Sequence, residues 1–118
     1  MKSRVREMTA VESAWIGAMI EAEGSVLWKK ARPNRRGVVF ARHIITLVNT
    51  DVEIISALLR TTNCGSVFRN WAREWHKGFR PTKPIYVWHV ARRREVEDIA
   101  RQCAPYSMKL QTLILSLL

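Results

Sequence analysis

Hydrophobic residues recur at three- and four-residue spacing over residues 10–23, which predicts a helix there. Thr9 and Glu12 form a capping-box pattern at its start, and Gly24 follows its end. The apolar side chains make two stripes, one of Val11, Ala14, Trp15, Ala18, Met19 and Ala22 and one of Ile16 and Ile20. A helix that is apolar on more than one face is expected to pack against its own sheet and against a partner.

Four segments rich in β-branched and aromatic residues predict strands at about 25–32, 38–48, 66–71 and 85–91. A Pro-Asn-Arg-Arg-Gly turn at 33–37 separates the first two, and a long basic connection separates the last two. Tyr86, Trp88 and Val90 alternate with Val87 and His89, so the two sets are expected on opposite faces of their strand. Each pair of strands is predicted to form an antiparallel hairpin.

Three further helices complete the pattern. A second capping box at 50–53 predicts a helix to about residue 61, followed by Gly65 as a C-cap or strand-entry glycine. Residues 94–103 carry one apolar stripe, Pro105 interrupts, and residues 107–118 predict a final helix. The order α-β-β-α-β-β-α-α predicts an α+β fold, with one four-stranded antiparallel sheet and helices on one face. The 118 residues suit a single domain, 1–118, with 1–8 as a short basic lead.

Charge adds a candidate partner. The chain holds 20 Lys and Arg against 10 Asp and Glu, a formal charge of +10, and two long stretches, 26–50 and 75–94, contain no acid. This balance favours a polyanion such as DNA, RNA or an acidic membrane surface. Cys64 and Cys103 match no metal-binding spacing and are interpreted as reduced, buried thiols. No run reaches membrane-spanning length and no signal-peptide pattern is present, so we expect a soluble protein of the cytoplasm or an organelle, without a membrane partner.

The end of the first helix carries the candidate chemistry. Glu21 and Glu23 lie in its last turn, where acidic side chains face the negative end of the helix dipole at a cost of about 0.3–1 kcal/mol each. A bound metal ion would offset that cost; two solvated surface glutamates are the alternative. Gly17 lowers helix stability by roughly 1 kcal/mol, which indicates that another backbone passes close by.

Residues 15–25, WIGAMIEAEGS, resemble the signature of the LAGLIDADG homing endonucleases, with Glu21-Ala22-Glu23-Gly24 in place of the acidic-small-acidic-Gly helix end. The segments IITLVNTDV (44–52), NCGSV (63–67), YVWHV (86–90) and the Ala-Pro-Tyr run before Lys109 are similar to later elements of that family, in the same order. Both acidic positions are Glu where the family often has Asp.

The resemblance implies a saddle-shaped sheet whose concave face lies along the DNA major groove. Because the chain has one copy of the signature, the resemblance implies a homodimer on a long pseudo-palindromic duplex site. Its interface would be helix 10–23, with Trp15, Gly17, Ala18, Met19 and Glu21 in or near it. Trp15 and Trp88 are interpreted preferentially as core residues.

The resemblance also implies roles in catalysis. Glu23 aligns with the catalytic acid that holds a divalent metal, with the Ala22 carbonyl as an added ligand and Mg²⁺ as the expected ion. Glu21 takes a position that usually does not ligate metal, and we expect it to interact with nearby backbone or basic groups. Lys109 resembles the lysine beside the metal, and Asn49 falls near the scissile phosphate. The alternatives are a solvated first-turn residue for Lys109 and a helix cap for Asn49.

Base readout is expected from side chains of the sheet, because Arg pairs with guanine and Thr contacts the thymine methyl. The candidates for base or phosphate contact are Lys29, Arg32, Arg35, Arg36, Arg42, Thr46, Arg69, Arg73, Lys77, Arg80, Lys83 and His89. Those in the connections, such as Arg35 and Arg36, are expected on phosphates. Hydrophobic alternation leaves open which face of the strands they share.

The sequence therefore predicts a metal-dependent, site-specific DNA endonuclease that hydrolyses phosphodiester bonds as a homodimer. A non-cleaving nucleic-acid-binding protein of the same fold, such as an intron-splicing maturase or a transcription regulator, is the alternative. A basic structural protein such as a ribosomal component is a third, though such chains usually lack an acid pair at a helix end.

Overall fold

The computed structural model describes residues 2–30, 33–38, 41–71 and 84–117, with the backbone alone at 28–30, 41 and 71. Its elements are α1 (Ala10–Glu23), β1 (Gly24–Lys30), β2 (Ala41–Asn49), α2 (Val52–Thr62), β3 (Ser66–Trp71), β4 (Pro84–Val90), α3 (Arg93–Cys103), the short 3-10 helix η1 (Ala104–Tyr106) and α4 (Met108–Leu117). The predicted element order and the α+β class are confirmed. None of the described helices is long and apolar enough to cross a bilayer.

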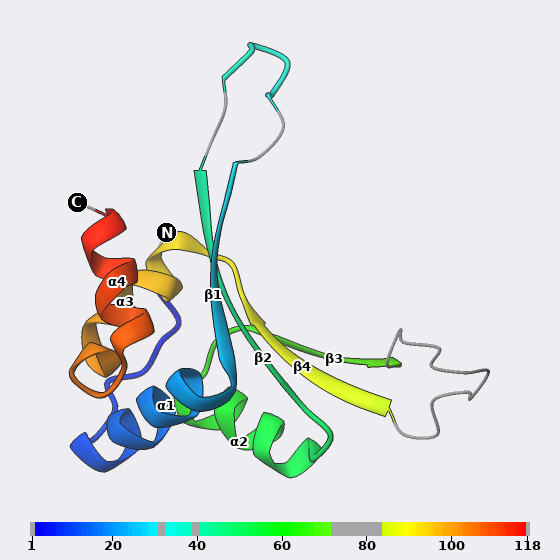
Figure 1. Cartoon of the computed structure of the whole chain (residues 1–118), viewed down its shortest axis with the longest axis vertical. Helices are drawn as coiled ribbons and strands as arrows, with labels where there is room; N and C mark the ends of the chain where they lie inside the picture. The colour runs from blue at the N-terminus through cyan, green and yellow to red at the C-terminus, as the bar shows by residue number, and fades with distance from the viewer. Residues whose placement is uncertain (1, 31–32, 39–40, 72–83, 118) are drawn as a thin grey trace.

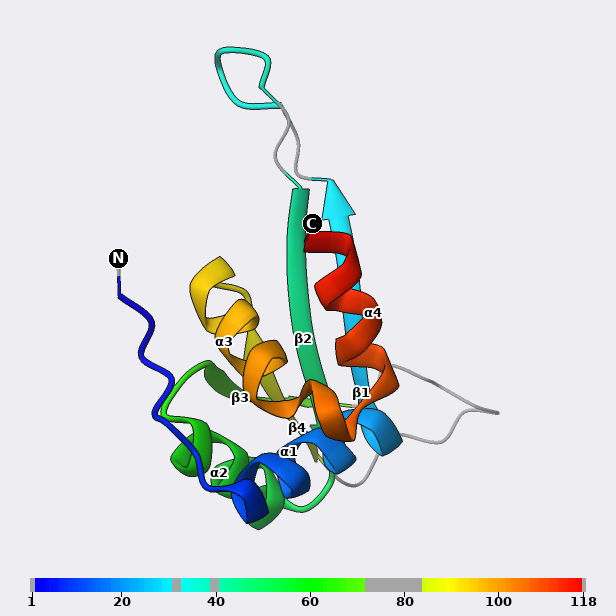
Figure 2. The ribbon, with the colours of Figure 1, turned by 90° about the vertical axis from the view of Figure 1, so that its left-hand side faces the viewer.

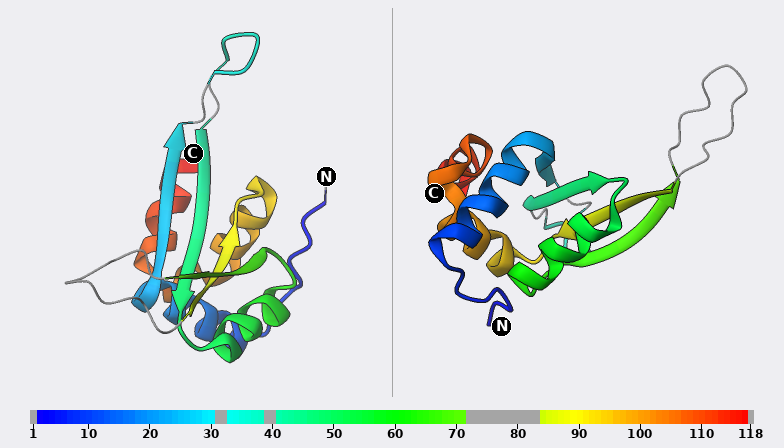
Figure 3. Two further views of the ribbon diagram at one scale, coloured as in Figure 1. Left: turned by 90° about the vertical axis from the view of Figure 1, so that its right-hand side faces the viewer. Right: turned by 90° about the horizontal axis from the view of Figure 1, so that it is seen from below.

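The four strands form one antiparallel sheet in the order β1-β2-β4-β3. Its two hairpins join at the centre, where Ile45 of β2 pairs with Val26 of β1 and with Val90 of β4. The sheet twists strongly, and α1 to α4 cover one of its faces (Figures 1 and 2). Seen from the opposite side, the strands lie in front of the helices (Figure 3, left). The predicted arrangement, with helices on one face, is therefore confirmed, and none of the described elements covers the other face, which we call the open face.

The core lies between the sheet and the helices. Ile45 and Leu47 of β2 and Trp88 of β4 are buried there against Ile16 and Ile20 of α1. The Trp88 indole donates a hydrogen bond to the Cys64 carbonyl over 2.9 Å, so its polar atom is satisfied inside the core. This confirms the core assignment of Trp88.

Helix α1 begins with the predicted capping box: the Thr9 hydroxyl accepts from the Glu12 amide, and the Glu12 carboxylate accepts from the Thr9 amide. Ile16 and Ile20 form its buried stripe. Most of the longer apolar stripe faces outward: Val11 is 79% exposed, Trp15 is 36% exposed, and Ala18 and Ala22 are exposed too, whereas Met19 is half-buried against the core. Trp15 is therefore not a core residue, because its place on the helix turns it away from the sheet.

The close neighbour that Gly17 predicts is in the same chain. A Cβ at Gly17 would lie 2.7 Å from the Tyr106 Cβ and 2.8 Å from the Cys103 carbonyl oxygen. Those distances are shorter than van der Waals contact, so α1 and η1 pack this tightly only with glycine at this position. Gly17 is buried by this contact and does not lie on the exposed stripe.

The start of α2 differs from the prediction. Its N-cap is Asp51, whose carboxylate accepts from the Glu53 amide, and no Thr50–Glu53 capping box forms. Asp51 outcompetes Thr50 because its carboxylate already reaches the first-turn amide. Asn63 ends the helix in the left-handed region with φ 59°, and Gly65, with φ 90°, leads into β3.

The two cysteines are free and buried, as expected. Burial raises the pKa of the Cys64 thiol to about 11 and that of Cys103 to about 12. Both therefore stay as neutral thiols at neutral pH and act as core residues.

Candidate functional site

The three residues with predicted catalytic roles meet where α1 ends. Glu23 is the last residue of α1, Asn49 is the last residue of β2, and Lys109 lies in the first turn of α4. The Asn49 Nδ2 donates to Glu23 Oε2 over 2.9 Å, and the Lys109 Nζ donates to the Gly24 carbonyl over 2.8 Å. Three segments that are distant in sequence thus form one polar corner.

Asn49 is held in the orientation that this contact needs. Its Oδ1 accepts from the Asp51 amide over 2.8 Å, so its Nδ2 is the group that faces Glu23. The side chain therefore serves the start of α2 and the end of α1 together. Both roles considered for Asn49, a cap and a site residue, are compatible with this geometry.

Glu21 secures α4 beside this corner. Its Oε1 accepts from the Ser107 hydroxyl over 3.1 Å and from the Lys109 amide over 3.0 Å. The hydrogen bond from the Lys109 backbone N–H, the hydrogen bond from the Ser107 hydroxyl and the Lys109 charge lower the pKa of the Glu21 carboxyl. Desolvation raises this pKa, but the net shift is below the usual value. Glu21 is therefore a positioning residue for Lys109, and it is turned toward α4 and away from the exposed stripe of α1.

The corner offers oxygen atoms to a hard cation. Glu23 is exposed, and no described residue other than Asn49 bonds its carboxylate. The Ala22 carbonyl belongs to the last helical turn, where carbonyls lack intrahelical partners. No group of three His, Cys, Asp or Glu gathers anywhere in the described ranges. One carboxylate and one carbonyl per chain fit Mg²⁺, which keeps several waters and takes phosphate oxygens.

Strand pairing decides which side chains share the open face. Ile45 and Leu47 point into the core, so their neighbours on β2, Arg42, Thr46 and Val48, lie on the open face. Residues paired across an antiparallel sheet share a face. The register therefore adds Ser25, Leu27 and Lys29 of β1, Ile85, Val87 and His89 of β4, and Ser66, Phe68 and Asn70 of β3.

Five of the predicted base-reading residues are placed by this register. Arg42, Thr46 and His89 lie on the open face, and Lys29, whose side chain is outside the described atoms, pairs with Arg42. Arg69 pairs with Tyr86, which pairs with Asn49, so the register places Arg69 on the opposite face of the sheet from Thr46, and its contact with DNA stays a prediction.

The basic residues of the connections divide into two groups. Arg35 and Arg36 are exposed in the turn at 33–38, which the Asn34 side chain organises by accepting from the Arg36 and Val38 amides. Five other predicted DNA contacts lie outside the described residues: Arg32, Arg73, Lys77, Arg80 and Lys83.

Sequence reasoning missed how apolar the open face is. Leu27 and Val48 are each 42% exposed there and Phe68 is 46% exposed, while Ile44 and Val87 lie almost covered between them. The Phe68 and His89 rings are neighbours, with centroids 6.4 Å apart. Alternation could not reveal this patch, because both faces of these strands carry apolar residues.

The structure resembles solved homing endonucleases. I-CvuI in complex with the I-CreI target, in the presence of Mg, matches with a TM-score of 0.65 at 16% identity over 90% of this chain and 64% of that chain. The archaeal intron-encoded I-Vdi141I complexed with DNA matches with a TM-score of 0.60 at 19% identity over 81% of this chain and 55% of that chain. The LAGLIDADG homing endonuclease I-SmaMI bound to cleaved DNA matches with a TM-score of 0.62 at 17% identity over 96% of this chain and 36% of that chain.

These matches establish the fold. The chain spans less than two thirds of the length of each of these three proteins. No protein-family model and no curated protein sequence matches the chain.

Proposed function

We propose that this chain, which has the fold of the LAGLIDADG homing endonucleases, is a metal-dependent DNA endonuclease that works as a homodimer. The observation that carries the proposal is the corner at the end of α1, where Glu23, Asn49 and Lys109 converge. The corner lies beside the exposed apolar stripe of α1, which suits a second copy, and the open face of the sheet supplies Arg42 and Thr46 for the duplex.

Glu23 and the Ala22 carbonyl would hold the metal, with Mg²⁺ as the proposed ion. When bound, such an ion activates water and offsets the charge that develops on a phosphate during hydrolysis. The reaction adds water across one P–O bond in each DNA strand. Because each chain offers one such carboxylate, two chains are needed to cut both strands.

The protein's own groups orient the reacting atoms. The Asn49 amide fixes one Glu23 oxygen, and no described residue bonds the other. Glu21 holds the first turn of α4 through the Lys109 amide, so the Lys109 ammonium stays at the end of α1. From there the ammonium can stabilise negative charge on the scissile phosphate, as preorganised cations do in enzyme sites.

The dimer contact would be formed by the exposed stripe of α1. Ala14, Ala18 and Ala22 recur every four residues on it, and small residues at that spacing let two helix backbones approach closely. Val11 and Trp15 add apolar area that would otherwise face water. Because Ala22 adjoins Glu23, pairing along this stripe would bring the two Glu23 carboxylates to either side of the two-fold axis. The target would then be a pseudo-palindromic duplex.

The proposal is tested by cleavage of a randomised duplex library with the purified chain. With Mg²⁺ we expect double-strand breaks at one family of pseudo-palindromic sequences, and with EDTA we expect binding without breaks. A second candidate, a non-cleaving nucleic-acid-binding protein, is favoured by the bond that ties the Lys109 ammonium to the Gly24 carbonyl. Binding that never leads to breaks with any divalent ion would select this second candidate.

The apolar open face predicts a preference for thymine. Leu27, Val48 and Phe68 can contact the C5-methyl groups that thymine presents in the major groove. Replacing thymine by deoxyuridine in a selected duplex should weaken binding about tenfold, which corresponds to roughly two lost methyl contacts of about 0.8 kcal/mol each. Fluorescence anisotropy measures both affinities. The salt dependence should not change, because the phosphates are the same; equal affinities would refute the preference.

A further inference from the structure

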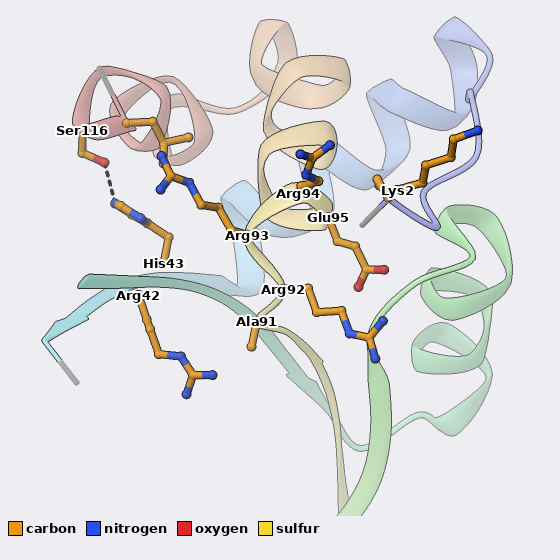
Figure 4. Close-up of a pocket in the computed structure, with 11 residues that line it drawn as sticks. Lys2, Arg42, His43, Ala91, Arg92, Arg93, Arg94, Glu95 and Ser116 are labelled. Atoms are coloured by element: carbon orange, nitrogen blue, oxygen red, sulfur yellow. Dashed lines mark hydrogen bonds between the residues drawn. The ribbon is translucent and has the colours of Figure 1, made fainter. Parts of the chain in front are cut away.

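A cavity of about 680 Å³ opens where β4 stops beside β2. Val90, the last residue of β4, pairs with Ile45, so β2 continues past it through His43 and Arg42 without that neighbour. The chain turns there through Ala91 and Arg92 into α3. Figure 4 shows the cavity between this turn, β2, the end of α4 and the N-terminal segment.

The cavity wall is strongly basic. It carries Lys2, Arg42, Arg92, Arg93 and Arg94, which we call the basic corner. Arg93 is bonded to Glu97 over 2.8 Å, whereas the other four cations have no ion pair or side-chain hydrogen bond with any described residue. The wall also holds one acid, Glu95, which is only 4% exposed. Four cations that share one cavity without partners repel one another, so an anion there would stabilise the arrangement.

The chemistry of the corner suits a phosphate group. Three of its four unpaired cations, Arg42, Arg92 and Arg94, are guanidinium groups, whose planar donors match phosphate oxygens. A point cation such as Lys2 adds charge without that geometry.

The corner is continuous with the open face of the sheet. Arg42 belongs to that face by register, and in Figure 4 the Arg42 and Arg92 side chains extend to the same side of the strands, while Arg93 extends to the other. A sheet that enters the major groove is flanked by the two phosphate backbones of the duplex. A cation cluster at the border of the sheet therefore lies where a backbone would pass.

We propose that the basic corner binds phosphates of the DNA backbone next to the groove that the open face occupies. This rests on the proposed DNA binding and extends it to Arg92 and Arg94, which the sequence had not singled out as contacts. These contacts position the duplex on the protein and carry no base information.

The test compares two double variants with the same loss of charge. Arg92→Ala with Arg94→Ala removes two corner cations, and Arg60→Ala with Arg101→Ala removes two exposed cations from the helix layer. Binding to a random-sequence duplex is followed by anisotropy between about 50 and 200 mM salt. The slope of log affinity against log salt should become shallower by about 0.9 for each lost phosphate contact, so by about 1.8 in the corner variant. The control variant should keep the wild-type slope.

Each outcome decides a point. If the salt slope of the Arg92→Ala, Arg94→Ala variant is unchanged while the wild type binds normally, the basic corner does not bind DNA phosphates. The proposed function then still stands. A wild type that binds no duplex overturns both. Circular dichroism checks folding; if the double variant unfolds, Arg92→Gln and Arg94→Gln alone carry the test, each with a change of about 0.9. Calorimetry with inorganic pyrophosphate tests whether the basic corner binds a free anion instead. Pyrophosphate binding that depends on Arg92, together with an unchanged salt slope for DNA, would also refute the proposal that the basic corner binds DNA phosphates.

Discussion

Glu23→Gln should abolish cleavage and leave DNA binding intact. The amide keeps the size of the carboxylate and can still pair with Asn49, but it loses the charge that would hold a divalent ion. Removing several kcal/mol of charge stabilisation from the reaction corresponds to a loss of about 10³-fold or more in rate. The measurement is single-turnover cleavage of a selected duplex with Mg²⁺, alongside anisotropy in EDTA.

The direction of the binding change sharpens this test. Glu23 is exposed, and in the proposed complex it lies next to the scissile phosphate, so its neutralisation removes a negative charge close to the DNA and should leave affinity equal or slightly higher. Glu53→Gln is the matched control, because Glu53 is an exposed helix residue of α2 outside the site, and its cleavage rate should be that of the wild type. Cutting that survives in Glu23→Gln would remove this carboxylate from the mechanism.

Ala18→Glu should turn a dimer into a monomer. Ala18 is exposed in the middle of the α1 stripe, so the chain should fold as before, and Glu is a good helix former. Across a two-fold axis the substitution would place two like charges in an apolar contact, which costs several kcal/mol and weakens association by roughly 100-fold or more. Sedimentation should show the mass fall from twice 13.7 kDa to 13.7 kDa, with loss of double-strand cutting.

Leu115→Glu is the control for this substitution. Leu115 is also an exposed apolar residue on a helix, 71% accessible, but it lies on α4 and not on the α1 stripe. It should leave the dimer mass and cleavage unchanged. A wild-type chain that sediments as a monomer, or an Ala18→Glu variant that remains a dimer, would remove α1 from the proposed interface.

Local patterns sufficed for most elements of the fold. Three patterns act through neighbours a few positions away: the Thr9–Glu12 capping box, the apolar stripe from Val96 to Cys103 and the runs of β-branched residues. The helices and strands that they form can therefore be predicted from the sequence. The start of α2 is the exception, because its local pattern fits two different N-caps. Thr50 and Asp51 both qualify as caps, and the choice depends on backbone angles that composition does not reveal.

The candidate site was partly visible as well. Resemblance to a known helix signature pointed to Glu23, Asn49 and Lys109, and the structure brings their side chains to one corner. It did not show that Glu21 would bond the Lys109 amide, because that contact depends on how η1 and α4 pack against α1.

The sequence by itself determined the helices, the strands and the excess of positive charge, because periodicity, capping and composition act over short distances or over the whole chain. Only the tertiary structure decided which stripe of α1 is buried, that Gly17 meets η1, and that Arg69 and Thr46 lie on opposite faces of the sheet. When a strand has apolar residues on both faces, its sequence does not show which face packs against the helices. The pairing of β2 with β1 and β4, and the helices on one side of them, remove that ambiguity.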